Sequence, residues 1–485
     1  MSKIRSVKFN FVMNFILTAS SFIFPLITFP YVSRILLPEG NGKIAFATSI
    51  IFYFSVFAML GIPTYGIRAC AKVRDSREEL SRTVQELLII NTFTTAITYL
   101  VLIISLIIVP KFEEYRVLLI INSIGLILNV FGMNWLYSAL EQYSYITIRS
   151  LTFKVISIIL MFILVHHKSD YVIYATITVF ANVGSNVMNI INIRKFIFVK
   201  PVGHYNFKKH IKPIMTFCAM SVATSIYVNL DTVMLGYIKG DNEVGLYNAA
   251  IKIKMVLTSL VTSLGTVLLP RMSYYVNANK KDEFKNMMAK ALNFVILLSL
   301  PLTIFFIAYS KNIILLLSGT NYLGSIPAMQ IITPTIIFIG LTHILGIQVL
   351  VPLNGEKCVL TSEIVGGIVD VILNVIFITK MGAAGAALGT LGAEFSVLVV
   401  QAIYLRDFLG EIIKKINLRY VIVSCVVASA TLVLLKTVHI NSVFISLVIS
   451  ATVFFVSYGM ALLVQVEPLV SRIIFGYIKR INLRR

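Results

Sequence analysis

The chain has 485 residues, of which 58% are hydrophobic and only 13% charged, and its mean hydropathy is +0.89. Lysine and arginine nevertheless outnumber aspartate and glutamate by 42 to 21, which gives a formal net charge of +21. Apolar stretches as long as these indicate a membrane protein and exclude a soluble enzyme. We therefore expect an all-α integral membrane protein.

Fourteen apolar stretches between polar breaks are long enough to cross a bilayer. A helix needs roughly 20 mainly apolar residues to span a hydrocarbon core of ~30 Å. Lipid cannot satisfy backbone polar groups, so each crossing should be helical. The predicted spans are 11–33, 44–64, 85–109, 117–138, 147–165, 171–192, 213–236, 246–269, 291–309, 329–351, 359–379, 383–405, 420–436 and 442–465.

The positive charges test this arrangement independently, because lysine and arginine accumulate in cytoplasmic loops. With the N-terminus placed in the cytoplasm, 31 of the 42 basic residues fall on the cytoplasmic side, 9 on the opposite side and two inside span 246–269. Two of the 31 are assigned to the loop that follows span 117–138. The bias predicts that both termini are cytoplasmic.

The sequence offers no place for a cofactor or a nucleotide. The longest gap between spans runs from Arg194 to Lys212, and neither GxxxxGK[ST] nor GxGxxG before a helix occurs. We expect no bound metal, because the four cysteines show no CxxC spacing. The basic residues are scattered over short loops and a tail, which favours membrane lipid headgroups, and not nucleic acid, as their partner.

An internal repeat predicts two related halves, as in many transporters. At an offset of 203 residues the matched pairs are Gly42 with Gly245, Ala47 with Ala250, and Arg68 with Arg271. The hydrophobic breaks coincide at the same offset. We expect two pseudo-symmetric six-helix lobes around a central cavity, residues 1–204 and 205–410, followed by a final helix pair and a basic cytoplasmic tail, residues 411–485.

Charges within the spans point to function, because an ionisable group in mid-bilayer costs several kcal/mol unless it is paired or faces water. Asp231 and Lys252 lie ten and eleven residues on either side of position 241 in a connecting turn. Both are thus roughly 15 Å below that turn, and we expect them to meet near mid-membrane. Lys254 lies roughly 200° around the helix from Lys252, so at most one of the two lysines faces Asp231 or the cavity, and the sequence leaves open which one.

A second matched pair consists of Asp370 and Glu394, which each lie twelve residues from Gly382. Two carboxylates at one depth would share a proton, bind a cation or pair with a basic group from elsewhere. Structural interpretations stay open for both pairs. Asp231 and Lys252 could form an ion pair that only holds two helices together, and the two carboxylates could face different crevices.

Three prolines within predicted spans indicate bends. Pro25 and Pro30 both fall in span 11–33, and Pro334 falls in span 329–351. Two prolines in one span favour a hinge in the first helix.

Three segments together resemble the O-antigen and capsule repeat-unit flippases. They are Trp135 to Tyr143 leading to Arg149; Asn229 to Gly236 with VGLY at 244–247 and AIKI at 250–253; and Gly382 to Glu394. The resemblance covers nearly the whole chain. It implies a Wzx-like member of the multidrug/oligosaccharidyl-lipid/polysaccharide (MOP) exporter superfamily in a bacterial cytoplasmic (inner) membrane.

The resemblance implies a flippase and no enzyme activity. Its substrate would be an undecaprenyl-pyrophosphate-linked oligosaccharide, moved from the cytoplasmic to the outer leaflet for O-antigen or capsule assembly. Alternating access coupled to H⁺ or Na⁺ would drive this movement, with a polysaccharide polymerase and a chain-length regulator as further partners. A pyrophosphate needs cations in a water-filled cavity. Candidates for substrate binding are Lys252, Lys254, Asp231, Arg68 and Arg271, and candidates for ion coupling are Asp370 and Glu394.

Other functions stay open. A multidrug or cation antiporter of the same fold would use an acidic cavity, which Asp231, Asp370 and Glu394 could supply, although lysines repel cationic drugs. A peptidoglycan lipid II flippase would carry basic residues in the first two spans, and spans 11–33 and 44–64 have none. A membrane polymerase or ligase would need a large outer loop, and the outer loops are short.

Overall fold

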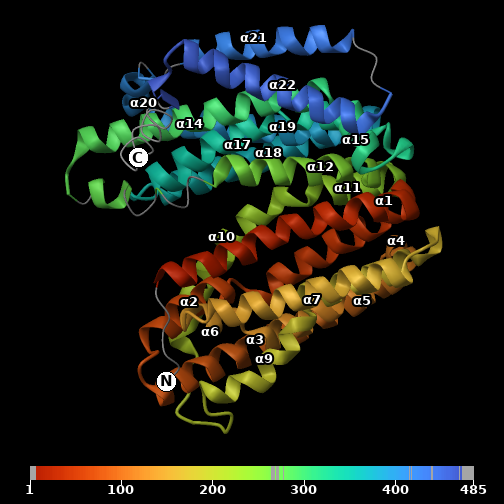
Figure 1. Cartoon of the computed structure of the whole chain (residues 1–485). Helices are drawn as coiled ribbons and strands as arrows, with labels where there is room; N and C mark the ends of the chain where they lie inside the picture. The colour runs from red at the N-terminus through yellow and green to blue at the C-terminus, as the bar shows by residue number, and fades with distance from the viewer. Residues whose placement is uncertain are drawn as a thin grey trace, which may run out of the picture. The chain divides into compact units, whose positions relative to one another are not determined.

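The computed structural model describes residues 7–263, 268, 272–276, 278–413, 415–416, 418–437, 441–468 and 470–471. Over these residues the chain folds into helices and short turns and forms no β-strand (Figure 1). A helix satisfies its backbone hydrogen bonds within one segment, so its apolar side chains can face lipid. The expected all-α membrane fold is confirmed.

Twelve helical segments of the described chain are long and apolar enough to cross a membrane. One of them, residues 12–72, contains both predicted spans 11–33 and 44–64. The predicted span 213–236 falls on two further helices, some of whose side chains lie outside the described set. The protein is thus a multi-pass membrane protein, while the count of fourteen and the cytoplasmic termini stay predictions.

Two compact units divide the chain, Met1–Asn248 and Ala249–Arg485. Helices of the first unit are α1 Val7–Met59, α2 Ile62–Lys72, α3 Arg77–Ile108, α4 Pro110–Glu114, α5 Arg116–Gly132, α6 Asn134–Ala139, α7 Tyr143–Leu164, α8 Tyr171–Val183, α9 Val187–Asn192, α10 Lys208–Val228 and α11 Leu230–Ile238. Helix α12, Asp241–Thr262, crosses the boundary between the units. The predicted lobe boundaries at residues 204 and 410 stay predictions.

The second unit contains the remaining long helices. They are α14 Lys281–Ala308, α15 Ser310–Leu317, α16 Ser325–Ile332, α17 Thr335–His343, a π-helical turn Ile344–Leu350, α18 Glu356–Met381, α19 Ala383–Tyr404, α20 Arg406–Ile413, α21 Leu418–Lys436 and α22 Val443–Val464. Within this unit α21 and α22 lie side by side, as do α18 and α19 (Figure 1).

Prolines interrupt these helices unequally. Helix α1 continues through Pro25 and Pro30 with helical dihedral angles, and its described break lies instead at Leu37, whose φ of 58° is left-handed, just before Pro38. This break separates the two predicted spans within α1. Pro334 lies between the end of α16 and the start of α17 and also has helical dihedral angles, so the bend predicted there stays a prediction.

The part of α1 around Pro38 and Gly42 packs backbone to backbone against the start of α12. A Cβ atom on Gly42 would lie 1.8 Å from the carbonyl oxygen of Asp241, and one on Gly245 would lie 1.9 Å from the carbonyl oxygen of Pro38. Only glycine permits so close an approach. Gly42 and Gly245 are also a pair matched by the internal repeat, so the repeat brings its related positions into contact.

Replacing Gly42 by alanine should therefore destabilise the protein. The added methyl group meets backbone and not a flexible side chain, so we expect a loss of about 1–3 kcal/mol or more. Thermal unfolding of the purified protein in detergent measures this loss. Gly459→Ala in α22 is the matched control, because a Cβ atom there meets nothing within 4 Å. Equal unfolding temperatures for Gly42→Ala and the wild type would contradict the close packing.

Candidate functional site

Lys154 lies in the middle of α7, and its side chain is buried, with 7% exposure. It follows the first residue of the helix by eleven positions, which corresponds to roughly 16 Å along the axis. Its Nζ atom donates hydrogen bonds to Ser20 Oγ at 2.9 Å and to Ser21 Oγ at 3.1 Å, both on α1. A cation is therefore held between two membrane-spanning helices of the first unit.

The partners of Lys154 solvate its charge without neutralising it. In the described part of the chain, no carboxylate lies within ion-pair distance of this ammonium group. Removing an ion from water without a counter-ion costs several kcal/mol. Ionisable residues kept in membrane spans at such a cost mark pathways for substrates or ions. Lys154 is thus a candidate for binding an anionic group.

Arg149, five residues earlier on α7, is buried as well, with 5% exposure. Its Nη2 atom donates to Asn134 Oδ1 at 2.7 Å, and its guanidinium lies 5.7 Å from the centroid of the Tyr145 ring. Its Nε and Nη1 atoms have no hydrogen-bond partner among the described residues. Arg149 is therefore a second buried cation of α7, and two of its nitrogen donors could bind a ligand.

The Asn134 amide that accepts from Arg149 belongs to a chain of hydrogen-bonded amide side chains. Asn134 Nδ2 donates to Asn186 Oδ1 at 3.3 Å, and Asn189 Nδ2 donates to Asn134 Oδ1 at 3.4 Å. Amides stabilise a cation through their carbonyl dipoles and carry no charge of their own. The surroundings of Arg149 are thus polar but neutral.

Arg149 and Lys154 correct the sequence-based charge count. They are the two basic residues assigned to the loop after span 117–138, and that assignment is wrong, because both lie inside α7. The predicted span 147–165 already contained both positions. A search for acidic and basic residues at matched depths misses them, since neither has an acidic counterpart at its depth in a neighbouring predicted span.

Two buried carboxylates of the second unit lie on the helix pair α18 and α19. A Cβ atom on Gly389 would lie 2.2 Å from Asn374 Oδ1 and 3.1 Å from Asp370 Oδ1, so this glycine lets the two helices approach closely. Asp370 is 1% exposed, and Glu394, five residues beyond Gly389, is 7% exposed. Both predicted ion-coupling residues are therefore buried in one helix pair, and the sharing of a proton or cation stays a prediction.

Asp231 is buried at the start of α11, with 3% exposure. The hydroxyl of Tyr247 in α12, itself fully buried, donates a hydrogen bond to Asp231 Oδ2. Lys252 and Lys254 follow further along α12, in the other unit, and both side chains are half-buried. The expected meeting of Asp231 with Lys252 stays a prediction.

The two arginines proposed from the repeat have different outcomes. Arg68 lies in α2 with an exposed side chain. Arg271 lies outside the described residues. A role for either in substrate binding stays a prediction.

Comparison with known proteins identifies two matching families. The pattern of the polysaccharide biosynthesis protein family matches residues 7–276, and that of the MatE family matches residues 217–387. A putative O-antigen transporter of Escherichia coli K12 is 24% identical over 404 residues, 83% of this chain and 97% of the relative. Another from Shigella dysenteriae is 26% identical over 411 residues, 81% of this chain and 98% of the relative.

Solved structures share the fold. The lipid II flippase MurJ in an inward closed conformation has a TM-score of 0.70 at 18% identity, covering 96% of this chain and 99% of that one. An inward-facing MATE multidrug resistance transporter of the MOP superfamily has a TM-score of 0.64 at 14% identity, covering 81% of this chain and 96% of that one. The first family pattern covers more than half of the chain. This chain belongs to the polysaccharide biosynthesis protein family, as a Wzx-like member of the MOP superfamily.

Proposed function

We propose that this protein is a flippase for a lipid-linked oligosaccharide whose headgroup is an anionic pyrophosphate. It moves the undecaprenyl-pyrophosphate-linked repeat unit from the cytoplasmic to the outer leaflet of the bacterial inner membrane, for surface polysaccharide assembly. The names of its relatives support transport of O-antigen. The observation that carries the proposal is the burial of the Lys154 ammonium group. Among the described residues, its hydrogen-bond partners are the two neutral hydroxyls of Ser20 and Ser21.

An anionic headgroup matches this environment physically. Charge-assisted hydrogen bonds between ammonium or guanidinium donors and phosphate oxygens are roughly twice as strong as neutral ones. A pyrophosphate would supply the counter-charge that Lys154 lacks in the described structure, and the open donors of Arg149 lie on the same helix. A cationic drug would be repelled by both groups.

We further propose that Asp370 and Glu394 couple transport to H⁺ or Na⁺. Their burial on α18 and α19 favours either protonation or binding of a cation. The same carboxylates, together with the MatE match at residues 217–387, support a cation or drug antiporter as the second candidate function. Transport of a polyprenyl-linked glycan or of a cationic dye distinguishes the two.

Lys154→Met should strongly reduce glycan export while the protein stays folded. Methionine keeps the length of the side chain, and the Ser20 and Ser21 hydroxyls still donate to the carbonyl oxygen of Leu17, so loss of the buried charge should cost little stability. A charge-assisted hydrogen bond contributes about 1.5–3 kcal/mol, so we expect transport to fall roughly 10- to 100-fold. The measurement follows surface glycan and leaflet-resolved lipid-linked repeat units in a deletion strain that expresses each variant.

Two further variants control this experiment. Lys154→Arg keeps the charge and should retain much of the transport. Lys290→Met removes an exposed lysine of α14 and should leave transport unchanged. Wild-type export by Lys154→Met would remove this lysine from the proposal, and normal surface glycan in the deletion strain, once redundant transporters are excluded, would favour the antiporter.

Neutralising the carboxylates of α18 and α19 should uncouple the protein from its ion gradient. The measured quantity is the increase in flipping rate that an imposed pH or Na⁺ gradient causes in proteoliposomes. We expect this increase to be at least tenfold smaller in Asp370→Asn and in Glu394→Gln than in the wild type. Asp407→Asn, at an exposed carboxylate of α20, is the control. A gradient response that is intact in both buried variants would show that coupling lies elsewhere.

Asp231→Ala and Lys252→Ala should each abolish export while leaving the protein in the membrane. Loss of Asp231 also leaves the Tyr247 hydroxyl without this acceptor, at a cost of about 1–3 kcal/mol. Asp231→Asn, which keeps an acceptor oxygen, separates loss of charge from loss of stability. Export at wild-type levels in both alanine variants would exclude these residues from the mechanism.

A further inference from the structure

The segment 196–207, which we call the strap, connects the first six predicted spans to α10 and is fastened to one face of α3. Ser81 Oγ accepts a hydrogen bond from the backbone N–H of Phe198 at 2.8 Å. One turn further along α3, Gln85 Nε2 donates to the carbonyl oxygens of Phe198 and Lys200 at 2.8 and 2.9 Å. Side chains of α3 thus satisfy backbone groups that a loop would otherwise leave to water.

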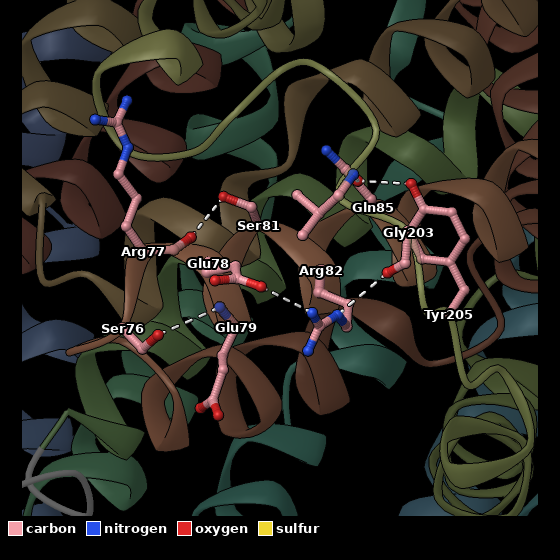
Figure 2. A network of polar contacts seen from close by, with 10 residues as sticks. Ser76, Arg77, Glu78, Glu79, Ser81, Arg82, Gln85, Gly203 and Tyr205 are labelled. Atoms are coloured by element: carbon pink, nitrogen blue, oxygen red, sulfur yellow. Dashed lines mark hydrogen bonds and ion pairs between the residues drawn. The ribbon is translucent and has the colours of Figure 1, made fainter.

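The second half of the strap is held in the same way. Gln85 Oε1 accepts from the backbone N–H of Val202 at 3.1 Å and from the Tyr205 hydroxyl at 2.8 Å. Arg82 Nε donates to the carbonyl oxygen of Gly203 at 3.2 Å. Figure 2 shows these two attachments, with Arg82 and Gln85 reaching from α3 toward Gly203 and Tyr205.

The strap ends at a buried cluster that joins α2, α3 and α10. Glu86 of α3 is fully buried and accepts hydrogen bonds from the backbone N–H of Asn206 at 2.6 Å and from His210 Nε2 at 2.8 Å. The Lys209 ammonium lies 2.8 Å from the same carboxylate. His210, at the start of α10, is 2% exposed and contacts the Tyr65 hydroxyl of α2 through Nδ1 at 2.7 Å.

The partners on the two sides of the ring fit a neutral His210. Its Nε2–H donates to the Glu86 carboxylate, which can only accept, and its Nδ1 then accepts from the Tyr65 hydroxyl. A second proton would have to bind at Nδ1. The Tyr65 O–H would then face a ring N–H, and its hydrogen bond would have to reverse or break.

Titratable groups of all three helices act on the ring or on its Tyr65 partner. Glu86 of α3 and Lys209 of α10 act on His210, and Arg68 and Cys70 of α2 together with Glu86 act on Tyr65. Burial lowers the pKa of His210 below its ordinary value, and the Glu86 carboxylate opposes that shift. The neutral ring therefore stabilises the fold above pH ~6.5, and this contribution is lost as the pH falls through the lowered pKa.

We propose that His210 is a proton-binding site whose occupation loosens the start of α10 from α2. A proton from water binds at Nδ1, and the Tyr65 hydroxyl loses its acceptor. The hydroxyl has to turn its hydrogen away from the ring, which disturbs the hydrogen-bonded connection between α2 and α10. The attachment of α10 to α2, at the end of the strap, then depends on pH. This proposal concerns how the helix is held and does not depend on the identity of the transported substrate.

The single tryptophan of the chain reports on this attachment. Trp135 is buried in an apolar cluster with Leu87 of α3, Ile197 of the strap and Ile214 of α10. Loosening the start of α10 would admit water to this cluster, and the emission of a hydrated indole moves to longer wavelength. Intrinsic fluorescence of the full chain in nanodiscs therefore follows this attachment without any transport assay.

In the wild type we expect a reversible red shift of several nanometres on acidification from about pH 8 to about pH 5. His210→Gln should abolish this transition, because its amide can still donate to Glu86 but cannot titrate. A wild-type emission that is constant over this range would overturn the proposal, as would an unchanged transition in His210→Gln.

Two conservative variants should move the midpoint in opposite directions. Tyr65→Phe removes the hydroxyl that stabilises the neutral ring, so its midpoint should rise. Glu86→Gln removes the charge that stabilises the protonated ring, so its midpoint should fall. If His210 had only a structural role, both variants would be less stable but their midpoints would not move in opposite directions. Midpoints that shift equally in one direction would contradict the proposal, even if His210→Gln did not fold.

Two other histidines provide controls. His204→Gln changes an exposed histidine of the same strap, and His343→Gln changes a half-buried histidine of α17 in the second unit. Both should show the wild-type transition. Loss of the transition in either control would assign the titration to that histidine and not to His210.

Discussion

The exclusion of water from the hydrocarbon core of a bilayer constrains every other feature of this protein. Helices satisfy the hydrogen bonds of their backbone groups internally. Hydroxyl side chains donate hydrogen bonds to carbonyl oxygens of the preceding turn, as Thr98 does to Thr94 at 2.8 Å. Glycines replace larger residues where backbones must touch, as at Gly42 and Gly245. A charge can persist in such an interior only with polar neighbours or a ligand, which makes the few buried charges informative.

Both units bury charged side chains in their helices. Helix α7 of the first unit holds Lys154 and Arg149 among neutral hydroxyls and amides. Helices α18 and α19 of the second unit hold Asp370 and Glu394 close to Gly389.

Matched depth was a useful but incomplete guide to the functional residues. It selected Asp231, Asp370 and Glu394, and the structure buries all three. It missed Lys154, because a cation solvated by two serines of another helix leaves no complementary charge in the sequence. The sequence could also not predict the contacts of Gln85 and Glu86 with the strap. Residues more than 110 positions apart meet there, and uncharged backbone groups provide most of the partners.

Hydropathy and the residue pattern by themselves determined the all-α membrane fold, the family and the break between the first two spans, because the helix period and the thickness of a bilayer act on each segment locally. Only the tertiary structure decided which charges are buried and what surrounds them. The depth of a side chain follows from its own segment, whereas its hydrogen-bond partners come from helices distant in the chain. The contacts of Lys154 with α1 and of His210 with α2 and α3 therefore depend on how the helices pack.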